Sequence, residues 1–408
     1  MSEHFDVMIV GGGLVGASLA CALAPLGIRV ALLEAVSPRA ESQPSYDDRT
    51  LALSDSSCRI LQGLGLWDSI QENATPIREI QVREHRRPGL VIMDPAELGL
   101  DRFGHVVEAR VFGAAVMQRL PGLDTLEFIC PAEVTSIEMA EDRAVVNYSG
   151  EHGEQQIQAK LLVGADGARS FVRESLGIAS ESHDYRQTAI ICNITPEQDH
   201  RGRAFECFTP SGPFAVMPHV NGRCGLIWCV PSEDVSKMME MPAEQFMHQA
   251  QHRFGNHLGR FLKIGNRSCY PLRLVRALED IRPRAVILGN AAHAIHPVGA
   301  QGFNLGLRDV AVLAEILSAA RDSGNAVDPG NIDLLQKYSA WRKLDQEGTI
   351  AYSDGLARIY SNPNPLARTA RTLGLLAHAF VPSLRRQLAV RAMGYRGYIP
   401  RLAAGESL

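Results

Sequence analysis

The sequence predicts an α/β fold in which a Rossmann-like domain carries an inserted, mainly antiparallel β-sheet and a C-terminal helical segment. Three observations predict it. Residues 5–34 read as strand, glycine turn, helix and strand; residues 183–232 contain strands with a period of two; and a second glycine-rich loop precedes a helix at 302–321. With 408 residues, 46% of them hydrophobic, the chain is long enough for more than one core.

The glycine turn is the first functional signal. Residues 5–10 form an apolar strand, a helix is expected from Leu14 to Leu26 with Gly27 as its cap, and the second strand ends at Glu34. In the motif, Gly11 makes the tight turn, Gly13 lets a pyrophosphate approach the backbone, and Gly16 allows close helix–strand contact. Glu34 can accept hydrogen bonds from a ribose 2′-OH and would repel a 2′-phosphate. The sequence therefore predicts a dinucleotide site that disfavours NADP.

The composition excludes several classes of protein. A net charge of −4 gives no general attraction to nucleic acid, so we expect no such partner. The apolar stretch after residue 8 is interrupted by glycines and lacks the positive flank of a signal peptide. No window of about 18 uncharged apolar residues predicts a spanning helix. We expect a cytoplasmic protein and leave peripheral contact with the inner membrane surface open, as well as the oligomeric state.

The eight cysteines include no C-x-x-C pair and lie within apolar runs. This pattern favours buried, reduced thiols, with a redox disulfide or a zinc site as the alternative. We therefore predict no metal site, and the missing pair argues against a disulfide reductase.

The remaining segments suggest that the dinucleotide-binding domain is discontinuous. A polar loop is expected at 36–50, helices at 52–65 and 108–120, and short strands at 76–100. We assign the chain to three parts, given by residue number: the dinucleotide-binding domain at 1–75, 105–182 and 268–350; a substrate domain at 76–104 and 183–267; and a basic helical region at 351–408.

The C-terminal region is strongly basic. Residues 355–408 carry eight arginines and one acid, Glu406. Four apolar residues fall on one helical face: Leu366, Leu373, Leu376 and Phe380. Such a helix fits an anionic membrane surface or an acidic partner. The alternative is a helical layer that packs on its own domain and leaves its arginines in solvent.

Two further motifs lead to a family. Asp166-Gly167 follows an apolar strand, and Gly289-Asn290 precedes the stretch HPVGAQGFNLGLRD at 296–309. With the glycine turn, these motifs resemble the single-component FAD-dependent aromatic hydroxylases of the p-hydroxybenzoate hydroxylase fold. Within that family, the stretch 296–309 resembles the ubiquinone-biosynthesis hydroxylases, and most of all those that act on 2-polyprenyl-6-methoxyphenols. The likeness covers roughly residues 5–320.

Two positions depart from the family pattern. Asn290 stands where most members have Asp, and its amide oxygen can still accept a hydrogen bond from a ribityl hydroxyl. Gly299-Ala300 reverses the usual Ala-Gly order. If the loop needs a positive φ at position 300, alanine there costs about 1 kcal/mol or more.

The resemblance implies a set of FAD contacts. The glycines of the turn would cradle the pyrophosphate, Glu34 the adenosine ribose, and Asn290 the ribityl chain, while backbone N–H groups at the start of the last helix would face the flavin. Asp166 and Arg173 belong to one segment, and the resemblance implies that this segment contacts both FAD and reduced nicotinamide. Arg49 and Arg110 are either FAD contacts or surface arginines. The expected cofactor residues are Gly11, Gly13, Gly16, Glu34, Arg49, Arg110, Asp166, Asn290, Gly302 and Asn304.

The resemblance also places residues beside the flavin and the substrate. His296 and Pro297 are expected next to the isoalloxazine, with a backbone-satisfied loop histidine as the alternative for His296. Met217, Pro218 and Trp228 either line the phenol pocket or belong to the sheet core. The implied chemistry is capture of O2 by reduced FAD and transfer of one oxygen atom, through a C4a-hydroperoxide, to an electron-rich ring. NAD(P)H is the implied transient electron donor.

Three functions follow from the resemblance. The first is hydroxylation of a polyprenylated phenol, of 2-polyprenyl-6-methoxyphenol type, in ubiquinone biosynthesis, in contact with a membrane surface or with other proteins of that pathway. The second is hydroxylation of another ring position or of a small soluble aromatic. The third is an FAD-binding scaffold subunit with little turnover.

Overall fold

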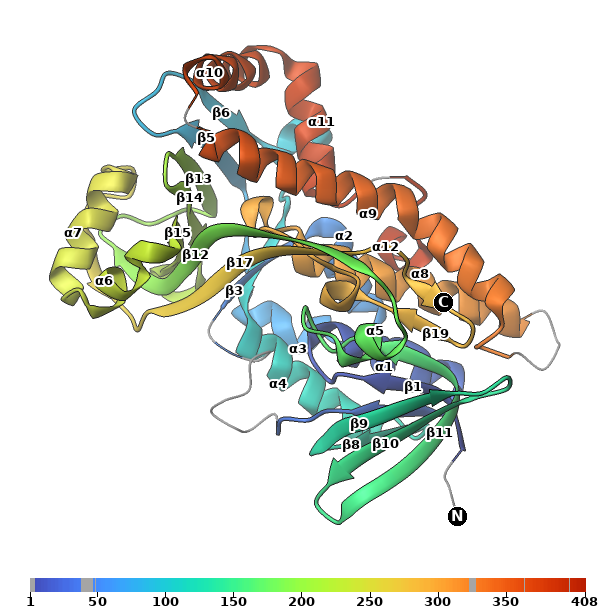
Figure 1. The fold of residues 1–408 in the computed structure, drawn as a ribbon. Coiled ribbons are helices and arrows are strands. Elements are labelled where there is room, and N and C mark those ends of the chain that lie inside the picture. The colour runs from blue at the N-terminus through green and yellow to red at the C-terminus, as the bar shows by residue number, and fades with distance from the viewer. Residues whose placement is uncertain (1–3, 38–46, 48, 323–327, 363, 396) are drawn as a thin grey trace.

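The structure is a computed structural model that describes residues 4–37, 47, 49–322, 328–362, 364–395 and 397–408 (Figure 1). The polar loop expected at 36–50 lies largely outside the described residues, and so does Arg396.

The first sheet forms the Rossmann-like part of the molecule, in the order β18-β19-β11-β1-β2-β8. Strand β1 pairs in parallel with β2 and β11, so their carboxyl ends meet at one edge. Helices α1 and α8 pack against each other in the same core. The bounds are β1 His4–Val10, β2 Val30–Leu33, β8 Leu126–Ile129, β9 Ala132–Met139, β10 Ala144–Gly150, β11 Gly153–Gly164, β18 Ile281–Arg282, β19 Ala285–Ile287, α1 Leu14–Leu23, α4 Ala109–Arg119, α5 Phe171–Ser175 and α8 Gly302–Asp322.

Two sequence-predicted helices differ from the structure. The first helix ends at Leu23 and continues as a 3-10 turn, Ala24–Leu26, because Pro25 cannot donate a backbone hydrogen bond. The helix expected at 52–65 is wrong in its first turn. Residues 50–54 form strand β3 and pair with β7, and α2 begins only after Ser54, whose hydroxyl accepts from Ser57 N. The third sheet comprises β3 Thr50–Ser54, β4 Thr75–Pro76 and β7 Gly104–Glu108, and α2 spans Asp55–Gly63.

The second sheet is mainly antiparallel, in the order β20-β17-β12-β15-β14-β13-β5-β6, as the sequence predicted for the inserted region. Both of its faces are covered. Helices α6 and α7 lie over one face, and the C-terminal helices lie over the other (Figure 1). The bounds are β5 Glu79–Glu84, β6 Leu90–Met93, β12 Ser180–Pro196, β13 Arg203–Thr209, β14 Gly212–Pro218, β15 Cys224–Pro231, β16 Phe261–Ile264, β17 Ser268–Ala277, β20 His293–Ala294, α6 Val235–Glu240 and α7 Ala243–Phe254.

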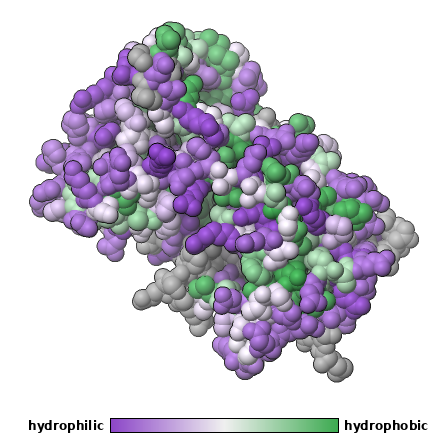
Figure 2. Space-filling model, in the orientation of Figure 1, coloured by the Kyte–Doolittle hydropathy of each residue, from purple (hydrophilic) through white to green (hydrophobic). Residues whose placement is uncertain are grey.

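The C-terminal region is helical, as predicted: α9 Ile332–Ser361, α10 Pro365–Phe380, α11 Pro382–Ala392 and α12 Arg401–Ala404. Helix α9 runs the length of the molecule from the Rossmann-like part to the upper end, where α10 packs on β6 (Figure 1). Leu375 is buried toward the sheet, whereas Leu366, Leu373 and Phe380 are 80%, 61% and 80% exposed. Apolar residues gather at this end of the surface (Figure 2). The region therefore packs on its own domain and also leaves an apolar face outside.

Candidate active site

The glycine turn sits where β1, β2 and β11 end together. A Cβ on Gly11, whose φ is +104°, would lie 2.6 Å from the carbonyl oxygen of Ala165, and one on Gly16 would overlap the carbonyl oxygen of Gly11. Gly13 is the N-cap of α1, and among the described residues no side chain caps that helix. The helix start therefore offers backbone N–H groups and positive dipole to an anionic group.

Glu34 is fixed beside this turn. One carboxylate oxygen accepts from Gly12 N at 2.7 Å and the other from Val36 N at 2.9 Å, and the side chain is buried. The geometry holds a negative charge at the end of β2, at the position where an acid meets a ribose hydroxyl in this type of fold.

The second motif is tied to the third by an arginine. Asp166 accepts from Ser170 Oγ at 2.5 Å and from Val172 N at 3.0 Å, so its carboxylate caps α5. Arg173 donates to Ala291 O at 2.8 Å and to Ala168 O at 3.0 Å. Within the described residues, Arg173 and Asp166 form no ion pair. Arg173 thus links the two loops through their carbonyl groups.

The third motif packs on the glycine turn itself. Gly289 has a φ of +54°, and a Cβ there would approach Val15 of α1 to 3.0 Å, while a Cβ on Gly306 would approach Val15 to 2.8 Å. Asn290 follows on the 3-10 turn Gly289–Ala291, with an exposed side chain. Segments that are almost 300 residues apart therefore converge on one helix start.

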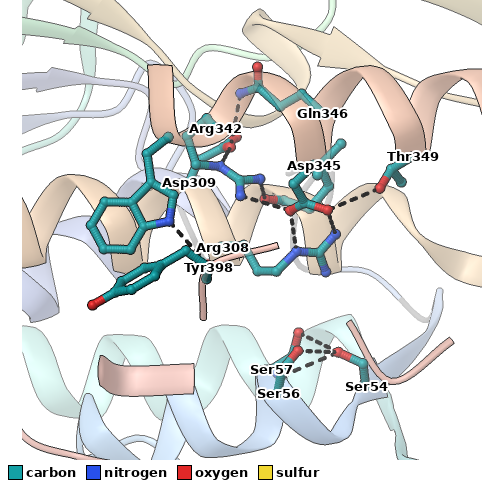
Figure 3. Close-up of polar contacts among 12 residues, drawn as sticks. Ser54, Ser56, Ser57, Arg308, Asp309, Arg342, Asp345, Gln346, Thr349 and Tyr398 are labelled. Carbon is teal, nitrogen blue, oxygen red and sulfur yellow. Dashed lines mark hydrogen bonds and ion pairs between the residues drawn. The ribbon is translucent and has the colours of Figure 1, made fainter. Parts of the chain in front are cut away.

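A buried ion network holds this convergence (Figure 3). Asp309 accepts from Gly289 N at 3.0 Å and from His293 Nε2 at 2.6 Å. It also accepts from Arg342 Nε at 2.8 Å, a bond that Figure 3 draws. Arg342 and Arg308 each donate to Asp345 at 2.7 Å. Desolvation raises the pKa of Asp309, but the interactions with His293 and Arg342 outweigh it and hold that pKa well below its usual range. His293 is therefore engaged in the network as a structural partner of Asp309.

The loop before α8 adopts the strained geometry that the sequence analysis considered. Gly299 has a φ of +70° and Ala300 a φ of +52°. Asn304 fastens the loop to the small sheet, because its amide donates to Ala300 O at 2.7 Å and to Ala52 O at 2.8 Å while its oxygen accepts from Ser54 N at 2.9 Å. Gly302 is the first residue of α8.

His296 is buried in this loop with both ring nitrogens occupied. Nδ1 accepts from Val298 N at 3.2 Å, which leaves Nε2 to donate to Gln187 Oε1 at 3.2 Å, and Tyr185 packs edge-on at 5.0 Å. Desolvation lowers the pKa of His296 to about 4, so the ring is neutral. The backbone thus satisfies one ring nitrogen of His296, and the Gln187 side chain satisfies the other. Pro297 follows it, half-buried.

Arg49 and Arg110 lie side by side, at the start of β3 and of α4. Arg110 N donates to Asp47 O, and Arg49 pairs with Asp47 at 2.7 Å and stacks over Tyr270 at 5.2 Å. Arg110 pairs with the buried Glu108. Arg49 lines a polar cavity of about 410 Å³.

A large apolar cavity of about 370 Å³ opens behind the loop at 298–301. Val298, Ala300 and Asn304 line it beside this loop, strands β5, β6, β13 and β14 line it from the second sheet, and α9, α10 and α11 contribute further walls that include Leu375 and Leu388. Among the sequence-predicted substrate residues, Met217 lines this cavity. Trp228 instead packs between Phe214 and Phe246 on the other face of the sheet, and Pro218 ends β14 outside the cavity lining.

The comparisons with known proteins agree with this geometry. Residues 4–350 match the family model described as an FAD binding domain. A ubiquinone hydroxylase, UbiL of Rhodospirillum rubrum, is 40% identical over 95% of this chain and 89% of its own length. The 3-demethoxyubiquinol 3-hydroxylase of Escherichia coli is 33% identical over 96% of this chain and 99% of its own. The chain belongs to the ubiquinone-biosynthesis family of FAD-dependent hydroxylases.

The fold of this hydroxylase is also that of solved aromatic monooxygenases. The p-nitrophenol 4-monooxygenase PnpA of Pseudomonas putida superimposes with a TM-score of 0.79 at 21% identity, over 97% of this chain and 100% of its own. This likeness shows the shared fold, while the assignment as an FAD-dependent hydroxylase rests on the family match and the relatives above. The glycine cradle of this chain, where a Cβ would fill the space, and the buried Glu34 fit that cofactor.

Two features of the hydroxylase escaped the sequence analysis. The cavity walls formed by the C-terminal helices carried no motif. Glu206 lines the cavity from β13. The sequence contains a signal for this residue, because it is an acid within the apolar strand Arg203–Thr209.

Proposed function

We propose that this monooxygenase hydroxylates the ring of a polyprenylated phenol, of 2-polyprenyl-6-methoxyphenol type, in ubiquinone biosynthesis, with electrons from reduced nicotinamide. The apolar cavity carries the proposal. It begins at the loop expected beside the flavin and continues between α9 and α10, so an aromatic head at one end would leave room for a prenyl tail along the other. Apolar walls favour such a tail by roughly 25 cal/mol per Å² removed from water.

The cofactor contacts are assigned as part of this proposal. The turn at Gly11, Gly13 and Gly16 holds the pyrophosphate, and Glu34 holds the adenosine ribose. Asn290 accepts from the ribityl chain. When bound and reduced, FAD supplies the activation of O2 and delivers one oxygen atom to the ring.

The remaining assignments concern the flavin edge and the outer contacts. The first N–H groups of α8, at Gly302 and Asn304, face the flavin with positive dipole. Arg49 and Arg110 face the diphosphate side, and Asp166 positions the loop that Arg173 ties to Ala291.

The protein's part in the reaction is to hold the phenol in a dry site. Met217 lies on the cavity wall, and Val298 and Ala300 close its flavin end. His296, neutral and fixed by Gln187, positions Pro297 and the loop.

We also propose that α10 rests on an anionic membrane surface, from which a prenylated substrate enters. Leu366, Leu373 and Phe380 of α10 project outward, and Arg368 of α10 and Arg386 of α11 are exposed. The inner face of α10 lines the cavity, so the tail end of the cavity lies at this surface. Among the described residues, no helix combines the length and apolarity needed to cross a bilayer.

Turnover tests the substrate assignment. The FAD-loaded protein is given NAD(P)H, O2 and 2-geranyl-6-methoxyphenol, and products are identified by mass spectrometry, with 4-hydroxybenzoate as the soluble alternative. The proposal expects O2-dependent addition of one oxygen atom to the prenylated phenol. Turnover of the soluble compound alone would favour the small-aromatic function, and loaded protein that oxidises neither would favour a scaffold.

Flotation tests the membrane face. Leu373→Ser combined with Phe380→Ser should reduce binding to phosphatidylglycerol-rich vesicles about tenfold or more, whereas Leu344→Ser, at a 72% exposed position on α9, should not. Equal binding of all three proteins, or equal binding to neutral vesicles, would contradict the proposed face.

A further inference from the structure

The apolar cavity contains one acid that the fold leaves without a partner. Glu206 points into it from β13, on the same face as Ala204 and Phe208. Its Oε1 is inaccessible to solvent and, among the described residues, has no hydrogen-bond partner. A buried carboxylate without a partner costs free energy, so its retention in a fold calls for an explanation such as a functional role or a bound ligand.

The charged groups of Arg308, Asp345 and Arg371, which also line the cavity, form ion pairs, although Arg308 Nη1 and Arg371 Nε have no hydrogen-bond partner among the described residues. Asp345, the second acid of the lining, accepts from Arg308, Arg342 and Thr349. Arg371 is paired with the buried Glu84. Among the described lining residues, Glu206 is thus the acid with an unpartnered oxygen.

The tyrosines beside Glu206 cannot act as bases near neutral pH. Burial raises the pKa of Tyr352 and of Tyr360, both on α9, to about 12. Burial also raises the pKa of Glu206 to about 7, so its carboxylate is present in quantity at the pH of the cytoplasm. The titratable and charged groups around it are Tyr352, Tyr360, Cys207, Cys229, Arg371, Arg391 and His378.

The register places Glu206 within reach of a ring held at the flavin end. Ala204 lies opposite Met217, since Phe205 pairs with Val216. Glu206 is two residues further along the same face, which is ~7 Å at 3.4 Å per residue. A phenol ring whose edge contacts Met217 can therefore present its hydroxyl toward Glu206. The hydroxyl of Ser353, the residue after Tyr352, donates to the carbonyl of His296 at 2.9 Å. This bond holds the middle of α9 next to the loop that contains His296.

We infer that Glu206 is the group that accepts the hydrogen bond, and then the proton, of the substrate's phenolic hydroxyl. The inference rests on the proposed phenolic substrate. As the ring carbon forms its bond to oxygen, the phenolic O–H bond breaks and its proton passes to a Glu206 carboxylate oxygen. Loss of the phenolic proton makes the ring more electron-rich. The O–O bond of the oxygen donor would break in the same step. The hydrogen already present on the oxygenated ring carbon would then leave as a proton, taken up by the second oxygen atom of O2, which is released as water. As the aromatic ring is restored, Glu206 returns its proton to the phenolic oxygen. No net proton or electron is consumed at the carboxylate.

The substrate and its O-methyl ether separate this role from a structural one. With 2-geranyl-6-methoxyphenol, Glu206→Gln should lower kcat/KM about 100-fold or more, because the amide cannot take a proton. The wild-type profile of kcat/KM should fall below pH ~7, and Glu206→Gln should lack that fall. With the ether, which has no proton to give, the variant should match the wild type. Glu181→Gln, at an exposed position on β12, is the matched control.

Binding provides a readout that needs no turnover. Flavin fluorescence of the oxidised, FAD-loaded protein gives the Kd of phenol and ether. The wild type should prefer the phenol about tenfold, and Glu206→Leu should lose the preference. Equal losses for phenol and ether, or an unchanged pH profile in Glu206→Gln, would overturn the inference while hydroxylation of the phenol by the wild type still upheld the proposed function. Conversely, a Glu206-dependent preference without hydroxylation would refute the proposed function alone.

Discussion

The unpartnered carboxylate of Glu206 should make the fold less stable as the pH rises. Burial raises its pKa from 4.5 to about 7, so the folded chain holds the proton more tightly than the unfolded chain does. The free energy of unfolding therefore decreases as the pH rises from 4.5 to about 7 and is constant above that. At about 1.36 kcal/mol per unit of pKa, the loss amounts to about 3 kcal/mol.

Glu206→Gln removes the ionisation and keeps the shape. The free energy of unfolding of the variant minus that of the wild type should increase by about 3 kcal/mol from pH 4.5 to pH 8. This increase does not depend on the size of the difference at pH 4.5. Urea unfolding of the FAD-loaded proteins at the two pH values, followed by far-UV circular dichroism, measures the difference. Glu181→Gln, on the exposed part of β12, should show no such gain. A stability difference between Glu206→Gln and wild type that is the same at both pH values would refute the reasoning.

Three other changes test the cofactor site and its supports. Ala300→Gly should raise the free energy of unfolding by up to about 1 kcal/mol, since the residue has a φ of +52°; calorimetry that shows a loss would contradict the strain. Gly16→Ala should abolish FAD retention on gel filtration because the new Cβ overlaps Gly11, and a fully yellow variant would show that the turn can open. Arg342→Met should lower the free energy of unfolding by about 3–5 kcal/mol, because Asp309 loses a buried cationic partner. A free energy from thermal unfolding within about 1 kcal/mol of wild type would show that the network is dispensable.

The features that could be predicted from the sequence are contained in one short segment or follow from a periodic pattern of apolar residues. The strand, the glycine turn and Glu34 lie within 34 residues, and the contact that requires a glycine at position 16 is with Gly11 of the same unit. The fold class followed because the periods of strand and helix alternate clearly along the chain. The error at residues 50–54 arose because Thr50–Ser54 is a strand only by virtue of its pairing with β7, some 50 residues later.

What the sequence could not predict depended on distant partners. Met217 and Trp228 lie on neighbouring strands, and only the register of β14 with β15 shows that they point to opposite faces. Both faces of this sheet are buried, so the apolar pattern does not say which face holds the cavity. The bond of His296 to Gln187 spans 109 residues. Glu206 stands out as an acid in an apolar strand, but that it remains unpartnered depends on α9 and α10.

The convergence on Val15 has a consequence for the order of events in synthesis. The helix start at the glycine turn is packed by Gly289 and Gly306, and Asp309 fixes the first of these. When the first 250 residues have been synthesised, the chain contains the entire glycine motif and Glu34. It does not yet contain Gly289, Gly306 and Asp309, which pack against or fix the start of α1. We therefore expect stable FAD capture only after the C-terminal third of the chain has been made and folded.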